Sequence, residues 1–255
     1  MDLVKTEDRG AVRHIVLARA DKRNAFNTDL VDATGAALRE AADDTNVRVV
    51  VIRGEGAVFS AGMDVKELAS LAGSPERLRE FRRRALEAWN LAEEMTKPVI
   101  AEIHGACMGG AMELALACDL RVMTENARLS IPEVRLGLVP DVGGSSRLPS
   151  IVGLGIAKEL ILTGREFDGN EAYRIGLANR AVPAEQLESA TAAIIDDLLN
   201  GLPTPVGLAK RLLDAAAKPA LAATLEMEVM AQEVSVAALA AAMRESSEDQ
   251  TQAVS

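Results

Sequence analysis

The segment 99-VIAEIHGACMGGAME-113 is the most informative part of the chain, because a strand gives way to a helix within it. Val99 to His104 is an apolar, β-branched run typical of a buried strand. Gly109 and Gly110 then begin a helix whose first turn carries Glu113. The first N–H groups of a helix are unpaired and partly positive, and glycine lets a ligand carbonyl approach them. This junction therefore suits an oxyanion with a proton-transferring carboxylate beside it, although tight packing around a dipole-favoured glutamate explains it equally well.

A second junction of the same kind, 59-FSAGMD-64, lies earlier in the chain. The β-branched run 47–53 predicts a buried strand before it, and Asp64 can cap a helix over residues 65–71. The N–H group of Met63 or of a neighbour would then supply a second donor. Two such donors would complete an oxyanion hole. The alternative is that Met63 fills space in the core, as methionine usually does.

Both junctions belong to an alternation of strands and helices that predicts an α/β fold with a largely parallel sheet. Strands are expected at 12–17, 47–53, 99–104, 120–123 and 129–131, and helices after Asn27 or Thr28 and from Pro75 to Thr96. From Gln186 onward, three helical stretches rich in Ala and Leu follow, interrupted at 201–203 and 218–219. The last of them, 220–243, has small apolar residues on several faces. We expect it to pack against the core or against a neighbouring subunit.

The composition excludes several classes of protein. The chain of 255 residues has 28 basic and 38 acidic residues, a formal net charge of −10, which argues against nucleic acid or an anionic membrane as a partner. Two cysteines cannot build a disulfide framework, and two histidines without a CxxC pair exclude multi-histidine metal sites. No secretory signal and no apolar run of about 18 residues is visible. We therefore expect a cytoplasmic protein without a metal.

Two further acids stand in apolar segments shaped by proline and glycine. Glu133 lies in 131-IPEV-134 and Asp141 in 138-LVPDVGG-144. Acids in apolar surroundings have raised pKa values and can exchange protons near neutrality, although each could also be a surface acid. The arginines between 77 and 84, Arg82 included, predict a solvated helix face, although such a cluster near a ligand entrance could attract phosphates.

Taken together, these segments resemble the enoyl-CoA hydratase/isomerase (crotonase) superfamily. The matching stretches are FSAGMDVKEL (59–68), HGACMGGAMELALACDLRV (104–122) and LSIPEVRLGLVPDVGGSSRLP (129–149), with weaker matches at 22–27 and 162–165. The resemblance implies a crotonase-like spiral of ββα turns over residues 1–185, which carries the active site. It also implies a C-terminal helical region over 186–255 that mediates homotrimers, often paired into hexamers.

The resemblance further implies an acyl-CoA thioester substrate, of the kind used in fatty-acid β-oxidation, and no metal or redox cofactor. The oxyanion hole of the family corresponds to the N–H groups of Met63 and Gly110, and the two glutamates of its hydratases match Glu113 and Glu133. Residues implied in binding the substrate are Lys22 and Arg23 toward the CoA phosphates, the loop of Ala61, Gly62, Asp64, Val65 and Lys66, and Gly109.

Asp141 departs from the hydratase pattern, because many hydratases have Gly at this position. An aspartate here resembles the dienoyl-CoA isomerases, which pair it with the acid that matches Glu133, but those enzymes typically have Asp where this chain has Glu113. The leading hypothesis is therefore an enoyl-CoA hydratase that adds water across a 2,3-double bond. The alternative is an enoyl-CoA or dienoyl-CoA isomerase that uses Glu133 and Asp141. A binding protein without enzymatic activity is a third hypothesis, since a fold alone does not fix a function.

Overall fold

The computed structural model describes residues 2–252, with the side chains of all of these except Ala72 and residues 245–252. A six-stranded sheet forms its centre, in the order β1-β2-β3-β4-β6-β8. The strands are β1 (Val4–Arg9), β2 (Val12–Leu17), β3 (Val49–Gly54), β4 (Val99–Ile103), β6 (Leu120–Thr124) and β8 (Arg180–Val182). All neighbouring strands are parallel except β1 and β2, which form an antiparallel hairpin. The predicted α/β class with a largely parallel sheet is confirmed.

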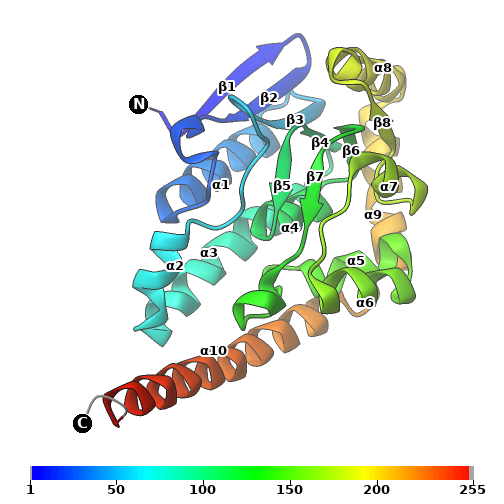
Figure 1. Ribbon diagram of the computed structural model, residues 1–255. Helices are drawn as coiled ribbons and strands as arrows, with labels where there is room; N and C mark the ends of the chain where they lie inside the picture. The colour runs from blue at the N-terminus through cyan, green and yellow to red at the C-terminus, as the bar shows by residue number, and fades with distance from the viewer. Residues whose placement is uncertain (1, 253–255) are drawn as a thin grey trace.

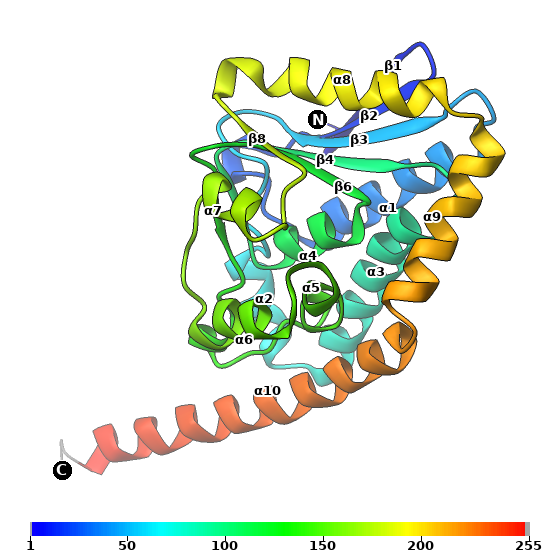
Figure 2. The same ribbon diagram turned by 90° about the vertical axis from the view of Figure 1, so that its right-hand side faces the viewer.

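Helices cover both faces of this sheet (Figure 2). α1 (Thr28–Asp43), α3 (Pro75–Glu94) and α4 (Gly110–Ala117) lie on one face, and α8 (Leu187–Asn200) lies on the other. Since successive strand residues point to opposite faces, Val50 and Ile52 of β3 belong to the main core, whereas Val49 and Val51 pack in the core under α8. This double burial explains why β3 is an unbroken run of β-branched residues.

A second, two-stranded sheet lies at the two predicted junctions, because Cys107 of this sheet also forms a bridge with Ser60. It pairs β5 (Ala106–Met108) with β7 (Arg128–Ser130) in parallel.

Asn27 caps α1 by accepting a hydrogen bond from the Leu30 N–H group, and Asp64 caps α2 (Val65–Ala72) by accepting one from the Lys66 N–H group. Both caps were expected from the sequence, and each fixes where the chain turns from a loop into a helix.

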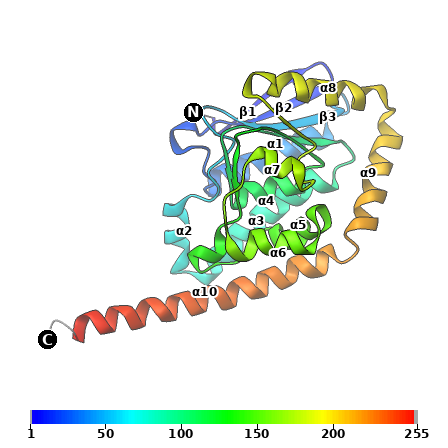
Figure 3. The same ribbon diagram turned by 45° about the vertical axis from the view of Figure 1, so that its right-hand side comes forward.

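The remaining helices lie below the sheet or along its side (Figures 1 and 3). They are α5 (Gly144–Val152), α6 (Leu154–Thr163), α7 (Gly169–Arg174), α9 (Pro203–Ala217) and α10 (Leu221–Gln252), with short 3-10 turns at Ala20–Lys22, Glu133–Leu136 and Ala184–Gln186. The three C-terminal helices predicted from the sequence are confirmed. α10 passes beneath α5 and α6, and its C-terminal part projects beyond the rest of the molecule. No helix in the described part of the chain combines the length and apolar character needed to cross a membrane.

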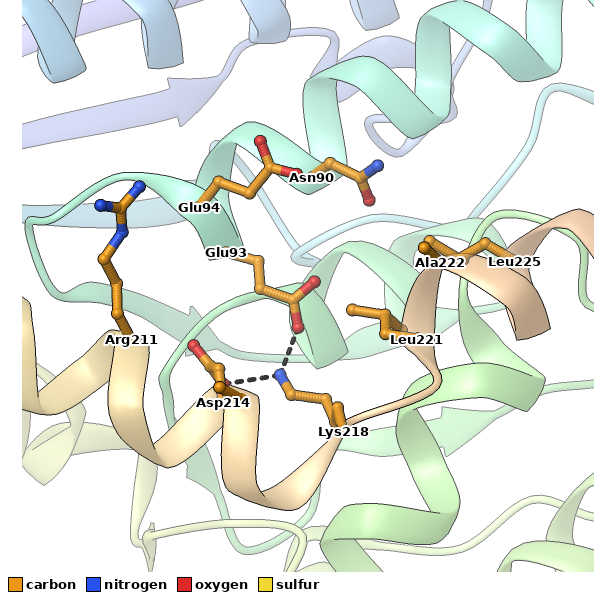
Figure 4. Close-up of a pocket in the computed structure, with 10 residues that line it drawn as sticks. Asn90, Glu93, Glu94, Arg211, Asp214, Lys218, Leu221, Ala222 and Leu225 are labelled. Carbon is orange, nitrogen blue, oxygen red and sulfur yellow. Dashed lines mark hydrogen bonds and ion pairs between the residues drawn. The ribbon is translucent and has the colours of Figure 1, made fainter.

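An ion-pair network fixes the turn between α9 and α10 (Figure 4). Lys218 pairs with Glu93 of α3 and lies 2.7 Å from Asp214 of α9, and the three side chains border a pocket of about 350 Å³. On its other side, Glu93 pairs at 2.9 Å with Arg147 of α5, whose side chain is fully buried. Because one carboxylate holds cations from two other elements, the start of α10 is tied to both α3 and α5.

Candidate active site

The two predicted junctions meet in space. The Ser60 N–H group donates to Ala106 O at 3.0 Å, and the Met108 N–H group donates to Ser60 O at 3.3 Å, so the segments run side by side. A Cβ atom on Gly62 would lie 2.4 Å from Met108 O, and one on Gly110 would lie 2.7 Å from the sulfur of Met63. Gly62 also has a φ of +90°, so the close backbone requires glycine there, whereas a side chain at Gly110 would have to displace the Met63 side chain.

Each junction presents one unused N–H group. Within residues 2–252, neither the Met63 nor the Gly110 N–H group donates a hydrogen bond to the protein. Gly110 is the first residue of α4, where the helix itself offers no acceptor. Met63 and Gly110 line the same cavity of about 150 Å³. Two donors at one cavity can hold a single oxygen atom that carries developing negative charge.

Glu113 lies in the wall of this cavity and is 2% exposed. Its Oε1 atom accepts hydrogen bonds from the Gly144 N–H group at 2.8 Å and from the Val142 N–H group at 3.1 Å. Burial raises the pKa of Glu113 well above its usual range, and the nearby Glu133 carboxyl raises it further. The backbone thus fixes one oxygen of a carboxyl group that retains its proton more readily than an exposed glutamate.

Glu133 lines the same cavity and lies at the start of the 3-10 turn after β7. Its Oε2 atom is buried and has no hydrogen-bond partner among the described residues. Its Oε1 atom faces Gly109, where an added Cβ atom would lie 2.7 Å away and where φ is +52°. Burial raises the pKa of Glu133 to about 7. The carboxyl group can therefore give or take a proton near neutrality.

Asp141 is the third acid of the cavity, and its side chain is 16% exposed. Burial raises its pKa to about 7, an effect that the Arg82 guanidinium, 3.8 Å away, partly offsets. The expectation of a fully solvated arginine face is thus wrong for Arg82, whose side chain is only 6% exposed. Its position on α3 turns it toward the cavity, whereas the adjacent Arg83 points to solvent.

Two residues of α10 belong to the site and were missed from the sequence. Glu228 accepts hydrogen bonds from the Gly143 N–H group (2.8 Å) and the Ser146 N–H group (2.6 Å), and Gln232 accepts one from the Val139 N–H group (2.9 Å). Gln232 also lines the cavity. The one sequence signal was their spacing of four residues, which places two polar side chains on one face of an Ala-rich helix.

The residues implied in substrate binding fall into two groups. Ala61, Gly62, Val65 and Gly109 line the cavity, whereas Lys22, Arg23, Asp64 and Lys66 are not part of its lining. The Arg23 carbonyl accepts a hydrogen bond from the Ala61 N–H group at 2.9 Å, so the segment of Lys22 and Arg23 lies beside the first junction. Asp64 caps α2 and pairs with Arg19 at 2.7 Å. A direct role of these residues toward CoA stays a prediction.

The chain is similar to known proteins in both sequence and structure. A family model described as enoyl-CoA hydratase/isomerase matches residues 7–248. The chain is 34% identical over 212 residues to a short-chain-enoyl-CoA hydratase of Clostridium acetobutylicum, covering 82% of this chain and 79% of that one. It is also 34% identical over 224 residues to the peroxisomal Delta(3,5)-Delta(2,4)-dienoyl-CoA isomerase of Arabidopsis thaliana, covering 84% and 81%. A solved enoyl-CoA hydratase/isomerase from Mycobacterium paratuberculosis superposes with a TM-score of 0.86 at 30% identity, over 92% of this chain and 94% of that one.

Proposed function

Since the chain belongs to the enoyl-CoA hydratase/isomerase family, we propose that it is an enoyl-CoA hydratase, which adds water across the 2,3-double bond of a 2-enoyl-CoA thioester. The observation that carries this proposal is the pair of buried carboxyl groups, Glu113 and Glu133, in one cavity with the free N–H groups of Met63 and Gly110. A hydratase needs two proton-transferring groups and a site for an oxyanion, and the cavity offers both.

The proposed reaction uses each of these groups once. The thioester oxygen accepts hydrogen bonds from the Met63 and Gly110 N–H groups. The water oxygen bonds to C3 while one carboxylate takes its proton, and the electrons of the double bond pass to the thioester oxygen. The other carboxyl group then protonates C2, and the thioester carbonyl is restored. Loss of one oxyanion donor costs about 10²–10³ in rate in other enzymes.

The pKa values of Glu113 and Glu133 suit one base and one acid in this reaction. Burial raises the pKa of both carboxyl groups, and the charge of Glu133 adds to the effect at Glu113. Two close carboxyl groups in an apolar cavity do not both ionise readily, so the pair retains a proton near neutrality. One member can therefore act as the base toward water while the other donates a proton to C2.

For the rest of the substrate, we propose that the loop from Ala61 to Lys66 lines the pantetheine and adenine parts of CoA. Lys22 is exposed beside this loop, and we propose that it and Arg23 approach the CoA phosphates. We also propose a homotrimer or a pair of trimers, a proposal supported by the apolar side chains that α10 exposes.

A mass-resolved assay with 2-enoyl-, 3-enoyl- and dienoyl-CoA esters tests the proposal, because hydration adds the mass of water and isomerisation leaves the mass unchanged. We expect Glu113→Gln and Glu133→Gln each to lower hydration by about 10²–10⁴-fold, as for other general acids and bases. Glu125→Gln, at an exposed turn after β6, is the matched control. No gain of water with any ester would refute the hydratase, and near-normal turnover of either glutamate variant would refute the two-glutamate mechanism.

Isomerisation is the second candidate, and the burial of Asp141 in the same cavity favours it. In this case Glu133 and Asp141 would move a proton between carbons of the acyl chain and no water would be consumed. We then expect Asp141→Asn to lower isomerisation by about 10²-fold or more, because an amide cannot take up or release the proton. A moved double bond at constant mass in the wild-type protein, lost in this variant, would replace the hydratase assignment.

A further inference from the structure

One end of the cavity contains a buried cation whose hydrogen bonds are largely unmade. The Arg82 side chain is 6% exposed, yet among the described residues its guanidinium makes a single hydrogen bond, from Nη1 to Val229 O at 3.4 Å. A guanidinium has five N–H donors, and a buried charged group is normally satisfied by several partners. Arg82 therefore has N–H donors without a protein acceptor among the described residues, and because it lines the cavity these donors are available to a ligand.

The Asp141 carboxyl group opposite Arg82 is equally short of partners. Its Oδ2 atom lies 3.8 Å from Arg82 Nη1, which is too long for a hydrogen bond. Within residues 2–252, no other residue donates a hydrogen bond to this carboxyl group. Two opposite charges thus face each other across a gap at the cavity without closing it.

Most of the remaining cavity wall is apolar, and its other polar side chains are Glu113, Glu133 and Gln232. Four apolar side chains line the cavity close in sequence to the pair. Leu78 and Phe81 precede Arg82 on α3, and Leu138 and Val139 precede Asp141. Apolar walls select an alkyl chain, and a polar pair within them selects a particular group on that chain. A hydroxyl oxygen can lie about 2.8 Å from both atoms of a pair that stands 3.8 Å apart, accepting from the guanidinium and donating to the carboxylate. A carboxylate on the chain would instead meet the like charge of Asp141.

We propose that Arg82 and Asp141 form a recognition site for a hydroxyl group on the acyl chain, so that the preferred substrate is a hydroxylated 2-enoyl-CoA. The proposal rests on the proposed hydratase function for the identity of the thioester, and in that reaction Asp141 has no proton to move. With an unsubstituted chain, the unused hydrogen-bonding capacity of both members of this ion pair would stay unsatisfied. Such a site discriminates strongly, because it penalises a ligand that lacks the hydroxyl group.

Calorimetric binding of saturated acyl-CoA esters tests the site without any turnover. A series of increasing chain length is measured with and without a terminal hydroxyl group, next to esters that end in a carboxylate. We expect one hydroxylated ester to bind about tenfold more tightly than its unsubstituted counterpart, as for a hydrogen bond to a charged group. Arg82→Met should bring this ratio close to one, and Arg83→Met, which removes an exposed charge from the same helix, should leave the ratio unchanged.

Arg82→Met leaves Asp141 buried without a counter-ion and can destabilise the fold, so the double variant Arg82→Met with Asp141→Leu is measured beside it. Replacing both members of a buried ion pair by apolar residues is often neutral or stabilising. The proposal is refuted if no hydroxylated ester is preferred, if a carboxylate ester binds most tightly, or if the folded variants retain the preference. Failure of the hydratase assignment is seen separately, as the absence of water gain with every 2-enoyl ester.

Discussion

Glu133 keeps a buried, unpartnered Oε2 atom in the wall of the cavity, which is a costly place for a carboxylate. Its pKa rises from an ordinary value of 4.5 to about 7, so the folded protein binds this proton more tightly than the unfolded chain does. The stabilising contribution is therefore complete below pH 4.5 and is lost as the pH rises through 7. At higher pH the folded protein must hold a buried negative charge.

We expect Glu133→Gln to raise the free energy of unfolding by up to about 3 kcal/mol at pH 8 and to change it little at pH 4. An amide of the same shape cannot ionise, which removes the penalty. Urea unfolding across this pH range measures the effect, with Glu125→Gln at the exposed turn as the control. An equal gain at both pH values would show that ionisation of Glu133 is not its cause.

The three acids of the cavity could be predicted from the sequence, whereas their partners could not. Glu113, Glu133 and Asp141 each stand in an apolar or glycine-bearing segment, and that local context already indicates burial. Arg82 occupies a run of arginines, in which only the rotation of α3 distinguishes the one buried side chain from its exposed neighbours. The hydrogen bonds of Glu228 join residues more than 80 positions apart, so no local pattern can reveal them.

At the scale of elements, α10 holds the loop that connects the 3-10 turn after β7 to α5. Glu228 and Gln232 accept hydrogen bonds from the N–H groups of Gly143 and Val139 in this loop, and Glu228 also accepts one from Ser146 in the first turn of α5. The neighbouring N–H groups of Val142 and Gly144 point to Glu113. The C-terminal helix thus positions the loop that fixes a proposed catalytic carboxyl group, although it contributes no acid to the proposed reaction.

We expect Glu228→Gln to lower kcat more than it raises KM and to shift the pH profile of kcat to lower pH. The charge of Glu228 raises the pKa of Glu113 and of Asp141, so its removal should lower both. The weaker acceptor for the Gly143 and Ser146 N–H groups at the start of α5 should also lower stability by about 1 kcal/mol. Steady-state kinetics across pH measure the shift, and Glu226→Gln, exposed on the same helix, is the control. A variant that loses stability with an unchanged pH profile would show that Glu228 is structural alone.

The strands that the sequence missed are those with too few buried residues to produce a pattern. β1 is a polar edge strand, 4-VKTEDR-9, whose side chains are mostly exposed, and its hairpin partner alone defines it. β5 and β8 have three residues each, too short for an alternation of apolar and polar side chains. The buried strands were predicted from their runs of β-branched residues, and the C-terminal helices from stretches rich in Ala and Leu that are interrupted at 201–203 and 218–219.

At the scale of the whole molecule, α10 has two faces with different surroundings. Glu228 and Gln232 face the loop before α5, whereas Met227, Met230 and Val234 are 64–70% exposed. The spacing of three and four residues places these three side chains on one stripe of the helix. A contiguous exposed apolar stripe on a helix that projects from the molecule (Figure 3) is typical of a protein–protein interface.

The family resemblance implies a homotrimer or a pair of trimers, and with this exposed stripe as its interface we expect sedimentation velocity to show such an assembly at micromolar concentration. The double variant Met227→Glu with Val234→Glu should shift the protein toward the monomer, because association would bury two unpaired charges. Glu226→Gln, between the two faces, should assemble normally. Since the opposite face of α10 fixes the loop around Glu113, the dissociated variant should also lose hydration in proportion to its fraction of monomer. A wild-type monomer at this concentration, or a dissociated variant with full activity, would show that α10 completes the site within one chain and needs no second copy.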